Sequence, residues 1–406
     1  MSKYRAFSVE EAISFAKTLP GLFPDNAQLT SEEIGDGNLN LVFRIRDSVS
    51  GQSIIFKQAL PYAKVVGESW PLTLDRARIE SEALLEQAKW VPHLVPKVFH
   101  YDEIMALTVM EDLSDHVIMR KGLMDGGEYP YFAGHISTFL AETLFHSTDL
   151  GMDQQAKKLL QKRFVNPELC KITEDLIFDH PYFNADTNHF ENELKSEVDR
   201  IWNNQSLHFE VALLREKFLT QSQALLHGDL HTGSIFVTPE STKVIDPEFA
   251  FYGPIGFDIG AIFANLLMNA AAQSYWSDGQ RNVSDVQNQL LNTISDIWVQ
   301  FEQKFVTLWN EKGVDRLSKT PGFQSDYLSR LLMDTFGYTG CKMVRRVIGL
   351  AHVADLDKMP IDNQRIAAKL AVLHLGQQFI LHHRNARSIS EMIDMSRAAL
   401  GTLVHT

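Results

Sequence analysis

The sequence has little that would indicate a secreted or nucleic-acid-binding protein. Only two cysteines, Cys170 and Cys341, occur in 406 residues, which excludes a disulfide framework and makes a reducing, cytoplasmic compartment the expectation. Lysine and arginine total 38 against 51 aspartates and glutamates. A general nucleic-acid binder is therefore excluded, because no basic excess exists to neutralise phosphates. No apolar segment follows the first residues, so no secretory signal is expected.

Long apolar runs, repeats and biased segments are also lacking. The longest apolar stretch, around residues 260–272, contains Asn265 and Asn269, so we expect a buried helix and no membrane association. What is present is an ordinary globular composition, with 45% hydrophobic and 22% charged residues. A chain of this length is expected to fold into two or three compact units.

Residues 1–112 are predicted to form a β-rich domain. Ser8 and Glu11 predict a capped helix that ends near Gly21. Alternating apolar residues predict four strands and helical spacing predicts one further helix. The expected strands cover residues 39–45, 53–58, 95–101 and 105–110, and the expected helix covers residues 74–88.

Residues 113–406 are predicted to be mainly helical, after a polar hinge at residues 111–115. The expected fold class is therefore α+β and bilobal, with a β-rich N-terminal lobe and a helical C-terminal lobe. The exception in the second part is a hairpin with strands at residues 235–237 and 243–245, because turn formers fill residues 239–242.

Two acidic motifs flank this hairpin. His227 to Ser234 reads HGDLHTGS, and residues 244–248 read VIDPE. The hairpin would bring Asp229 and Asp246 to the same end of a small sheet. Phosphoryl transfer requires such a pair, with one carboxylate to orient the attacking hydroxyl and another to hold a metal ion.

Asp246 and Glu248 form the candidate metal site. In an extended segment their side chains, two residues apart, would face the same side, and such hard oxygen ligands suit Mg²⁺. Pro247 would stiffen the backbone between them. Asp258 is expected to be structural, capping the next helix and tying down the catalytic loop.

Lys57 is the candidate phosphate-binding cation. It lies in an apolar predicted strand and could either face solvent or project towards a nucleotide. In the second case it needs an orienting carboxylate, which the helix at residues 74–88 offers as Glu80 or Glu82. We favour Glu80, because it lies beside the packed face. The glycine-containing turn at residues 35–40 could present backbone N–H groups to a phosphate.

A metal-dependent hydrolase is an alternative interpretation of the same residues. His227, Asp229 and His231 occupy alternate positions and could be metal ligands, with residues 246–248 supplying a bridging carboxylate. Such a hydrolase would not require the glycine turn, Lys57 or the polar hinge.

Arg345 and Arg346 lie in a predicted helix that apolar residues surround almost completely. A buried guanidinium group needs an anionic partner. The pair could form a structural salt bridge, or it could contact an anion or a sugar hydroxyl. A cationic acceptor such as choline or an aminoglycoside would be repelled by it.

Together these motifs resemble the protein-kinase-like small-molecule kinases, a superfamily that includes aminoglycoside and choline kinases. The closer resemblance is to the 5-methylthioribose kinase family and extends over nearly the whole chain. Its motifs cover residues 35–40, 56–58, 65–73, 109–113, 227–234, 246–254 and 345–352.

The resemblance implies an ATP-dependent kinase that phosphorylates the anomeric hydroxyl of 5-methylthioribose in methionine salvage, commonly as a homodimer. Asp229 would be the catalytic base and would contact the sugar, as would Arg345 and Arg346, with Trp70 against the methylthio group. Mg²⁺ would be held by Asp246 and Glu248. The implied ATP-binding residues are Gly37, Asn38, Asn40, Lys57, Glu111, Asp112, Leu113, Asp246, Pro247 and Glu248.

Two departures from the wider kinase pattern affect these roles. The glycine turn is not Gly-x-Gly-x-x-Gly, so Asn38, Asn40 and the backbone must grip the phosphates. Ser234 stands where related kinases carry a metal-binding asparagine, so Glu248 is the candidate second metal ligand. Another acceptor, such as homoserine, and a non-catalytic nucleotide-binding module remain open alternatives.

Overall fold

The structure, a computed structural model, describes residues 3–34, 40–63, 67–277, 281–360 and 362–405, without the side chains of residues 63, 67–70, 404 and 405. The chain divides into two compact units, Met1–His116 with Lys243–Ala250, and Val117–Thr242 with Phe251–Thr406. Residues 243–250 thus belong to the first unit. Hydrogen bonds hold them there, because the Val244 N–H donates to the Leu94 carbonyl at 2.7 Å and the Lys243 Nζ to the Val95 carbonyl at 3.2 Å.

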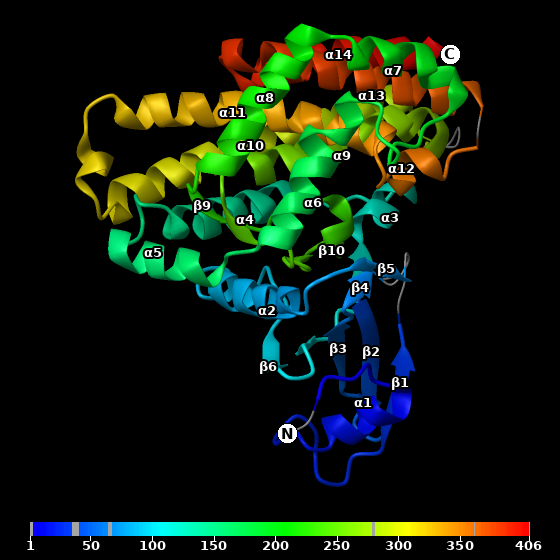
Figure 1. Cartoon of the computed structure of the whole chain (residues 1–406), viewed down its shortest axis with the longest axis vertical. Helices are drawn as coiled ribbons and strands as arrows, with labels where there is room; N and C mark the ends of the chain where they lie inside the picture. Colours follow the sequence, from blue (N-terminus) through cyan, green and yellow to red (C-terminus); the bar gives the residue numbers. More distant parts are fainter. Residues whose placement is uncertain (1–2, 35–39, 64–66, 278–280, 361, 406) are drawn as a thin grey trace. The chain divides into compact units, whose positions relative to one another are not determined.

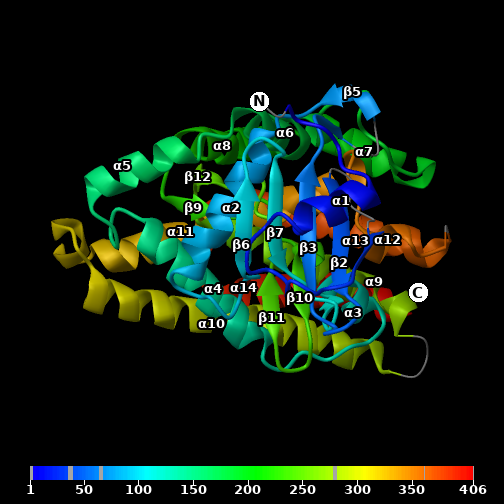
Figure 2. The same cartoon turned by 90° about the horizontal axis from the view of Figure 1, so that it is seen from below.

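The first unit contains an antiparallel five-stranded sheet in the order β1-β2-β3-β7-β6. Figure 1 and Figure 2 both show β2 and β3 side by side. Strands β4 and β5 form a separate antiparallel pair. The elements are α1 (Val9–Ala16), β1 (Leu29–Glu33), β2 (Asn40–Asp47), β3 (Ser53–Ala59), β4 (Tyr62–Ala63), β5 (Gly67–Pro71), α2 (Asp75–Ala88), β6 (Val98–Asp102) and β7 (Leu107–Glu111).

Helix α1 covers one face of this sheet. The predicted capping box is confirmed, since the Glu11 N–H donates to Ser8 Oγ and the Ser8 N–H to the Glu11 carboxylate. The helix ends at Ala16, earlier than predicted. Its core with the sheet is made of apolar side chains at alternate strand positions, among them Phe43, Ile45, Ile54, Phe56 and Val109.

Strand alternation turns Lys57 to the opposite face of β3 from Phe56, because successive side chains of a strand point to opposite faces. Helix α2 packs against β3, β6 and β7. Glu80, on this helix, is buried. The helix predicted at residues 74–88 is therefore confirmed, and it brings a carboxylate to the face that carries Lys57.

The second unit is mainly helical. Within the described residues its strands are short, with β8 paired to β10 and β9 paired to β12. No described helix is long and apolar enough to cross a membrane. Its elements are β8 (Val117–Ile118), α3 (Met119–Met124), α4 (Phe132–Ser147), α5 (Gln154–Arg163), α6 (Pro167–Phe178), α7 (Lys195–Trp202), α8 (Gln205–Thr220), β9 (Ala224–Leu226), β10 (Ile235–Val237), β12 (Phe251–Gly253), α9 (Gly256–Trp276), α10 (Val283–Lys312), α11 (Phe323–Ile348), α12 (Ala354–Asp357), α13 (Asn363–His382) and α14 (Ile389–Gly401), while β11 (Thr242–Val244) begins at its boundary.

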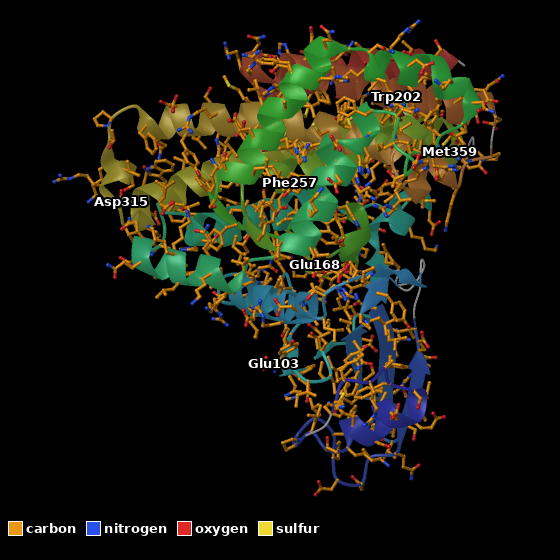
Figure 3. All side chains as sticks on the ribbon, in the orientation of Figure 1. Glu103, Glu168, Trp202, Phe257, Asp315 and Met359 are labelled. Atoms are coloured by element: carbon orange, nitrogen blue, oxygen red, sulfur yellow. The ribbon has the colours of Figure 1, made fainter. Side chains whose placement is uncertain are left out.

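Helices α9 and α11 form the centre of the second unit. Helix α9 is buried on all sides for most of its length, as predicted, and packs against α10, α11 and α13. Glycine allows its close approach to α11, because a Cβ atom at Gly260 would lie 2.8 Å from the Thr339 backbone nitrogen. Figure 3 shows Phe257, from the first turn of α9, in the interior of this unit.

The predicted hairpin strands correspond to β10 and β11, and the turn between them is closed by a hydrogen bond from the Thr238 N–H to the Ser241 carbonyl at 3.0 Å. The motif that contains Asp229 precedes this hairpin. It runs from β9 through residues 227–231 into a short 3₁₀ turn, Thr232–Ser234.

Candidate active site

The loop that carries Asp229 is fixed by Asp258 of α9. One carboxylate oxygen of Asp258 accepts the His227 N–H at 2.7 Å and the other accepts the Gly228 N–H at 3.1 Å. Gly228 has a φ of 85°, a conformation that glycine adopts without steric cost. Asp258 therefore ties down the loop as predicted. It does not cap α9, since Ile255 is at the N-cap position and Asp258 lies inside the first turn.

The carboxylate of Asp229 is surrounded by cationic and imidazole groups. Lys342 Nζ lies 3.3 Å from Oδ1, an Arg346 Nη atom lies 3.6 Å from the same oxygen, and His231 Nε2 lies 3.4 Å from Oδ2. The side chain remains 23% exposed, so a substrate hydroxyl can reach it.

Electrostatics keep Asp229 ionised. Burial would raise its pKa, but His231, Lys342 and Arg346 together hold that pKa well below its ordinary range. Burial lowers the pKa of His231 to about 4, so this imidazole is neutral at pH 7. The cations that act on Asp229 at neutral pH are therefore Lys342 and Arg346. An ionised carboxylate of this kind can accept a proton, and its low pKa makes it a weak base.

The two adjacent arginines differ in their partners. Arg346 pairs with Asp229 and donates to the Ala351 carbonyl at 3.0 Å, so the salt-bridge interpretation holds for this residue. Arg345 is 8% exposed, and its Nε and one Nη atom have no hydrogen-bond partner among the described residues. Burial lowers the pKa of both guanidinium groups, because the negative charge of Asp229 does not fully offset the cost of burying their positive charge.

Lys57 is the centre of a charged cluster in the first unit. Its Nζ donates to Glu80 Oε1 at 2.7 Å and also pairs with Asp246 Oδ1. Burial would lower the pKa of Lys57, but Asp246, Glu80 and Glu248 raise it above its ordinary value. The contact to Glu80 agrees with the predicted lysine-orienting role. Glu82 pairs instead with Arg78 at 3.0 Å.

Glu248 and Asn40 are held by a fully buried arginine that the sequence did not indicate. Arg76 Nε lies 3.1 Å from Glu248 Oε2, and a second nitrogen of Arg76 lies 2.8 Å from Asn40 Oδ1. Asn40 Nδ2 donates to the same Glu248 oxygen at 3.3 Å. Arg76 also donates to the carbonyls of Leu60 and Thr73. These contacts fix Asn40 and Glu248 in one orientation.

The segment at residues 246–248 is not extended as expected, because Asp246 has a φ of 69°. Aspartate tolerates this left-handed region better than most residues, and such conformations are frequent at functional sites. The two carboxylates still act on each other. Burial and then the charge of Asp246 raise the pKa of Glu248, while Lys57 and Arg76 oppose the rise.

The predicted hinge residues have defined contacts in the first unit. Asp112 accepts hydrogen bonds from Arg44 Nε at 3.0 Å and Ser53 Oγ at 2.6 Å, and Glu111 pairs with Lys243 at 3.2 Å. Leu113 is buried. The acidic side chains of Glu111 and Asp112 are thus used for structure.

Three predicted residues cannot be placed. Gly37 and Asn38 lie outside the described residues, and Trp70 belongs to β5 but its side chain is not described. Pro247 lies between the two acidic residues and is buried.

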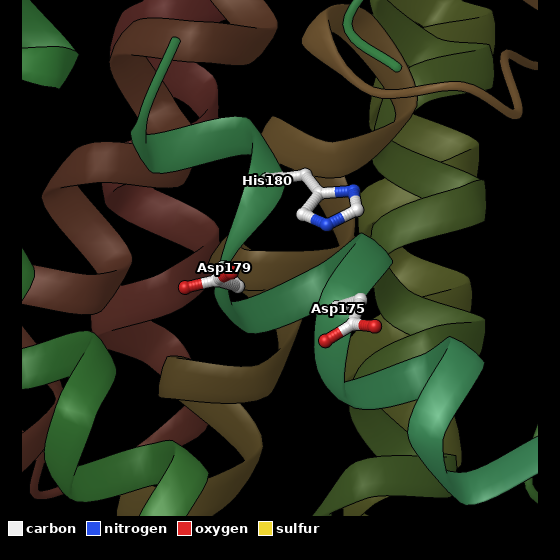
Figure 4. A group of neighbouring side chains, drawn as sticks. All are labelled: Asp175, Asp179 and His180. Atoms are coloured by element: carbon white, nitrogen blue, oxygen red, sulfur yellow. The ribbon is translucent and has the colours of Figure 1, made fainter. Parts of the chain in front are cut away.

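The predicted histidine ligands of a hydrolase do not gather around a metal position. His227 Nδ1 accepts the Asp229 N–H at 3.3 Å, and His231 contacts the Asp229 carboxylate. Among the described residues, the one group of three side chains with metal-ligand spacing is Asp175, Asp179 and His180, at the end of α6 (Figure 4). Lys171 pairs with Asp175, Arg215 with Asp179 and Thr187 with His180. This group is therefore already engaged within the protein.

Comparisons with known proteins identify the family. The chain matches the model of the phosphotransferase enzyme family over residues 30–281. It is 52% identical over 389 residues to the methylthioribose kinase of Geobacillus sp. (strain WCH70), with 96% of this chain and 95% of that protein covered. The chain belongs to the methylthioribose kinase family. It is also 45% identical over 392 residues to the methylthioribose kinase of Bacillus pumilus (strain SAFR-032), with 97% and 96% covered.

Membership in the methylthioribose kinase family confirms the predicted α+β, protein-kinase-like fold class and the prediction of a kinase. The hydrolase alternative is therefore wrong. Among solved structures, choline kinase from Cryptosporidium parvum Iowa II is 14% identical with a TM-score of 0.47, covering 98% of this chain and all of that one.

Two residues next to the predicted site were missed. Lys342 precedes the arginine pair on the same helix, and Arg76 precedes Glu80 on α2. Helical spacing was the available signal, since positions 342 and 346 lie one turn apart on one face, as do positions 76 and 80. The apolar segment around Lys342 adds to this signal, whereas Arg76 lies among other charged residues.

Proposed function

We propose that this kinase transfers the γ-phosphoryl group of ATP to the anomeric hydroxyl of 5-methylthioribose and forms 5-methylthioribose 1-phosphate. The observation that carries the proposal is the ionised Asp229 carboxylate held among cations, next to Arg345, whose Nε and one Nη atom have no hydrogen-bond partner among the described residues. The relatives at 45% and 52% identity over nearly the whole chain are named for this sugar, which supports the choice of acceptor.

Asp229 is the proposed catalytic base. Its carboxylate would accept the proton of the anomeric hydroxyl as the hydroxyl oxygen bonds to the γ-phosphorus and the bond to the ADP oxygen breaks. The low pKa of Asp229 makes it a weak base, but an anomeric hydroxyl is more acidic than an ordinary alcohol. Positioning and charge neutralisation are expected to supply most of the rate enhancement.

Arg345 and Arg346 are the proposed acceptor-binding residues. The Nε and Nη groups of Arg345 that have no partner in the described part of the chain can donate to sugar hydroxyls or to the oxygens of the transferring phosphoryl group. Lys342 adds a third buried positive charge. Because this region has more cations than carboxylates, it favours a neutral polyol that becomes anionic on phosphorylation. It disfavours choline and aminoglycosides, which carry positive charge.

ATP binding is proposed for the first unit. Lys57, oriented by Glu80, would neutralise phosphate charge, and the backbone of Glu111, Asp112 and Leu113 would meet the adenine. Asn40, held by Arg76 and Glu248, would assist, as would Gly37 and Asn38.

A magnesium ion fits the chemistry of Asp246 and Glu248. Lys57 and Arg76 supply two positive charges to three carboxylates, of which Glu80 and Glu248 are buried and Asp246 is partly exposed. Burial raises the pKa of Glu80 to about 7, and the two neighbouring carboxylates add to the rise while Lys57 opposes it. Such excess negative charge on hard oxygen atoms suits Mg²⁺, which would neutralise phosphate charge when bound.

Further expectations concern the metabolic role of the protein, the contact of Trp70, the oligomeric state and the location in the cell. A role in methionine salvage would follow from the proposed product. Contact between Trp70 and the methylthio group, assembly as a homodimer and a cytoplasmic location stay predictions from the sequence.

The proposed acceptor is tested by ADP release with ATP and Mg²⁺ across a panel of acceptors. We expect kcat/KM to be highest for 5-methylthioribose and at least ~10-fold lower for ribose, because loss of an apolar group of this size weakens transition-state binding by that order. Choline, homoserine and an aminoglycoside should release no ADP above an acceptor-free control. A higher kcat/KM for any of these three would contradict the proposal.

Replacement of Arg345 by alanine tests the acceptor-binding role. We expect the KM for the sugar to rise by ~10-fold to ~10²-fold, as for the loss of hydrogen bonds from a charged donor, with little change in the KM for ATP. The matched control is Arg330→Ala on the same helix, where the arginine is exposed and pairs with Asp326. If Arg345→Ala lowered only the thermal stability, Arg345 would have a structural role.

A further inference from the structure

Lys342 is a buried lysine whose partners come from the catalytic motif and from α9. Its side chain is 2% exposed, and its Nζ lies 3.3 Å from Asp229 Oδ1 and 4.2 Å from the centre of the Phe257 ring. Among the described residues, Asp229 is its only hydrogen-bond acceptor. A buried ammonium group with a single anionic partner is costly to maintain, which calls for an explanation beyond packing.

The position of Lys342 is fixed by the packing of two helices. Gly256 and Gly260 bring α9 against α11, since a Cβ atom at Gly256 would lie 2.8 Å from the Thr335 backbone nitrogen. Phe257 and Asp258 follow Gly256 in the first turn of α9. The same helix that holds the backbone of the catalytic loop therefore also supplies the aromatic ring over which Lys342 lies.

The two oxygens of Asp229 have different surroundings. Oδ1 is contacted by both Lys342 and Arg346, whereas Oδ2 is contacted by His231 Nε2 at 3.4 Å. His231 is neutral at pH 7, because burial lowers its pKa to about 4. Oδ1 thus interacts with two full positive charges and Oδ2 with none, which makes Oδ2 the more basic oxygen.

We infer that Lys342 is a positioning residue that holds Asp229 Oδ1 together with Arg346, so that Oδ2 takes the proton of the acceptor hydroxyl. This inference rests on the proposed function. In the step, the hydroxyl proton moves to Oδ2 and the hydroxyl oxygen forms a bond to the γ-phosphorus. The bond between that phosphorus and the bridging oxygen breaks, and ADP leaves with the electron pair.

The protonation state of Lys342 should be visible in the pH dependence of kcat. Burial lowers the pKa of Lys342 to about 8, with Asp229 opposing the shift and the arginines adding to it. The ammonium group therefore loses its proton as pH rises through about 8, and its hold on Oδ1 is lost with it. The charged groups that act on it are Asp229 of the loop, Asp258 of α9, and Arg345 and Arg346 of α11. His231 of the loop acts on Asp229, and Arg120 of α3 acts on Arg346.

The test compares Lys342→Arg and Lys342→Met with the wild type, measuring kcat from pH 6 to 10 at saturating ATP and 5-methylthioribose. The wild-type kcat should fall as pH rises through about 8. Lys342→Arg should retain activity without this fall, because a guanidinium group stays charged. Lys342→Met should lose up to ~10²-fold in kcat below pH 8, as for a misplaced catalytic group, with an unchanged KM for ATP; above pH 8 the difference should shrink, because the wild-type Lys342 is then neutral as well.

The control is Lys217→Met, which removes a lysine paired with Asp334 of the same helix. It should keep the wild-type pH profile. A wild-type kcat in Lys342→Met, or an unchanged alkaline fall in Lys342→Arg, would overturn the inference; if Lys342→Met does not fold, the profile of Lys342→Arg decides. Failure of the proposed function is distinguishable, since the wild type would then release no ADP with this sugar.

Discussion

Replacement of Asp229 by asparagine is expected to lower kcat by at least ~10², and by up to ~10⁴, as for the loss of a general base. The amide keeps the shape of the side chain but cannot accept the hydroxyl proton. It also removes the negative charge that Lys342 and Arg346 share, so these cations would repel each other. The KM for ATP should change little. The measurement is steady-state ADP release with 5-methylthioribose.

The matched control for this substitution is Asp186→Asn. Asp186 is an exposed aspartate of the same unit, and its replacement should leave kcat unchanged. A thermal unfolding curve for each variant separates lost chemistry from lost fold. Near-normal turnover in Asp229→Asn would remove Asp229 from the role of base.

Replacement of Lys57 by methionine is the second large expected effect. We expect kcat/KM for ATP to fall by ~10² to ~10³, the usual loss when one fixed charge that stabilises the transition state is removed. The reason lies in the charged cluster around Lys57. Glu80 and Asp246 both lose their contact to this cation, and the pKa of Glu80 would rise further because Lys57 no longer opposes the rise.

The Lys57 variant should also change how stability depends on pH. The folded-state pKa of Glu80 is already raised to about 7, so the folded protein binds a proton more strongly than the unfolded chain. Stability from this group is present at low pH and falls as pH rises towards 7; without Lys57 the fall should be larger and extend to higher pH. Lys97→Met, at an exposed site in the same unit, is the control. Equal ATP kinetics in both variants would contradict the role of Lys57.

Local sequence patterns predicted much of the first unit. Strand alternation separated Phe56 from Lys57, and helical spacing placed Glu80 on the packed face of α2. The pair Lys57–Glu80 was predictable because both rules act over a few residues. The assignment of residues 243–250 to the first unit was not, because it depends on backbone hydrogen bonds to residues 94 and 95, far away in the sequence.

The contacts of Asp229 also depend on residues that lie far away in the sequence. The motif at residues 227–234 identified the carboxylate, but its partner Lys342 lies more than one hundred residues further along the chain. Helical spacing puts this lysine one turn from Arg346, but no local pattern indicates that Asp229 is its partner. The left-handed backbone of Asp246 was also missed, because a residue-by-residue pattern carries no information on φ at an aspartate.

The position of the phosphate in the product tests the central claim most directly. The wild-type protein is incubated with ATP, Mg²⁺ and 5-methylthioribose, and the product is analysed by ³¹P–¹H NMR. The account predicts a phosphate whose phosphorus couples to the anomeric proton, formed in equal amount with ADP. A phosphate on any other hydroxyl, or ADP formed with inorganic phosphate and no phosphorylated sugar, would contradict it.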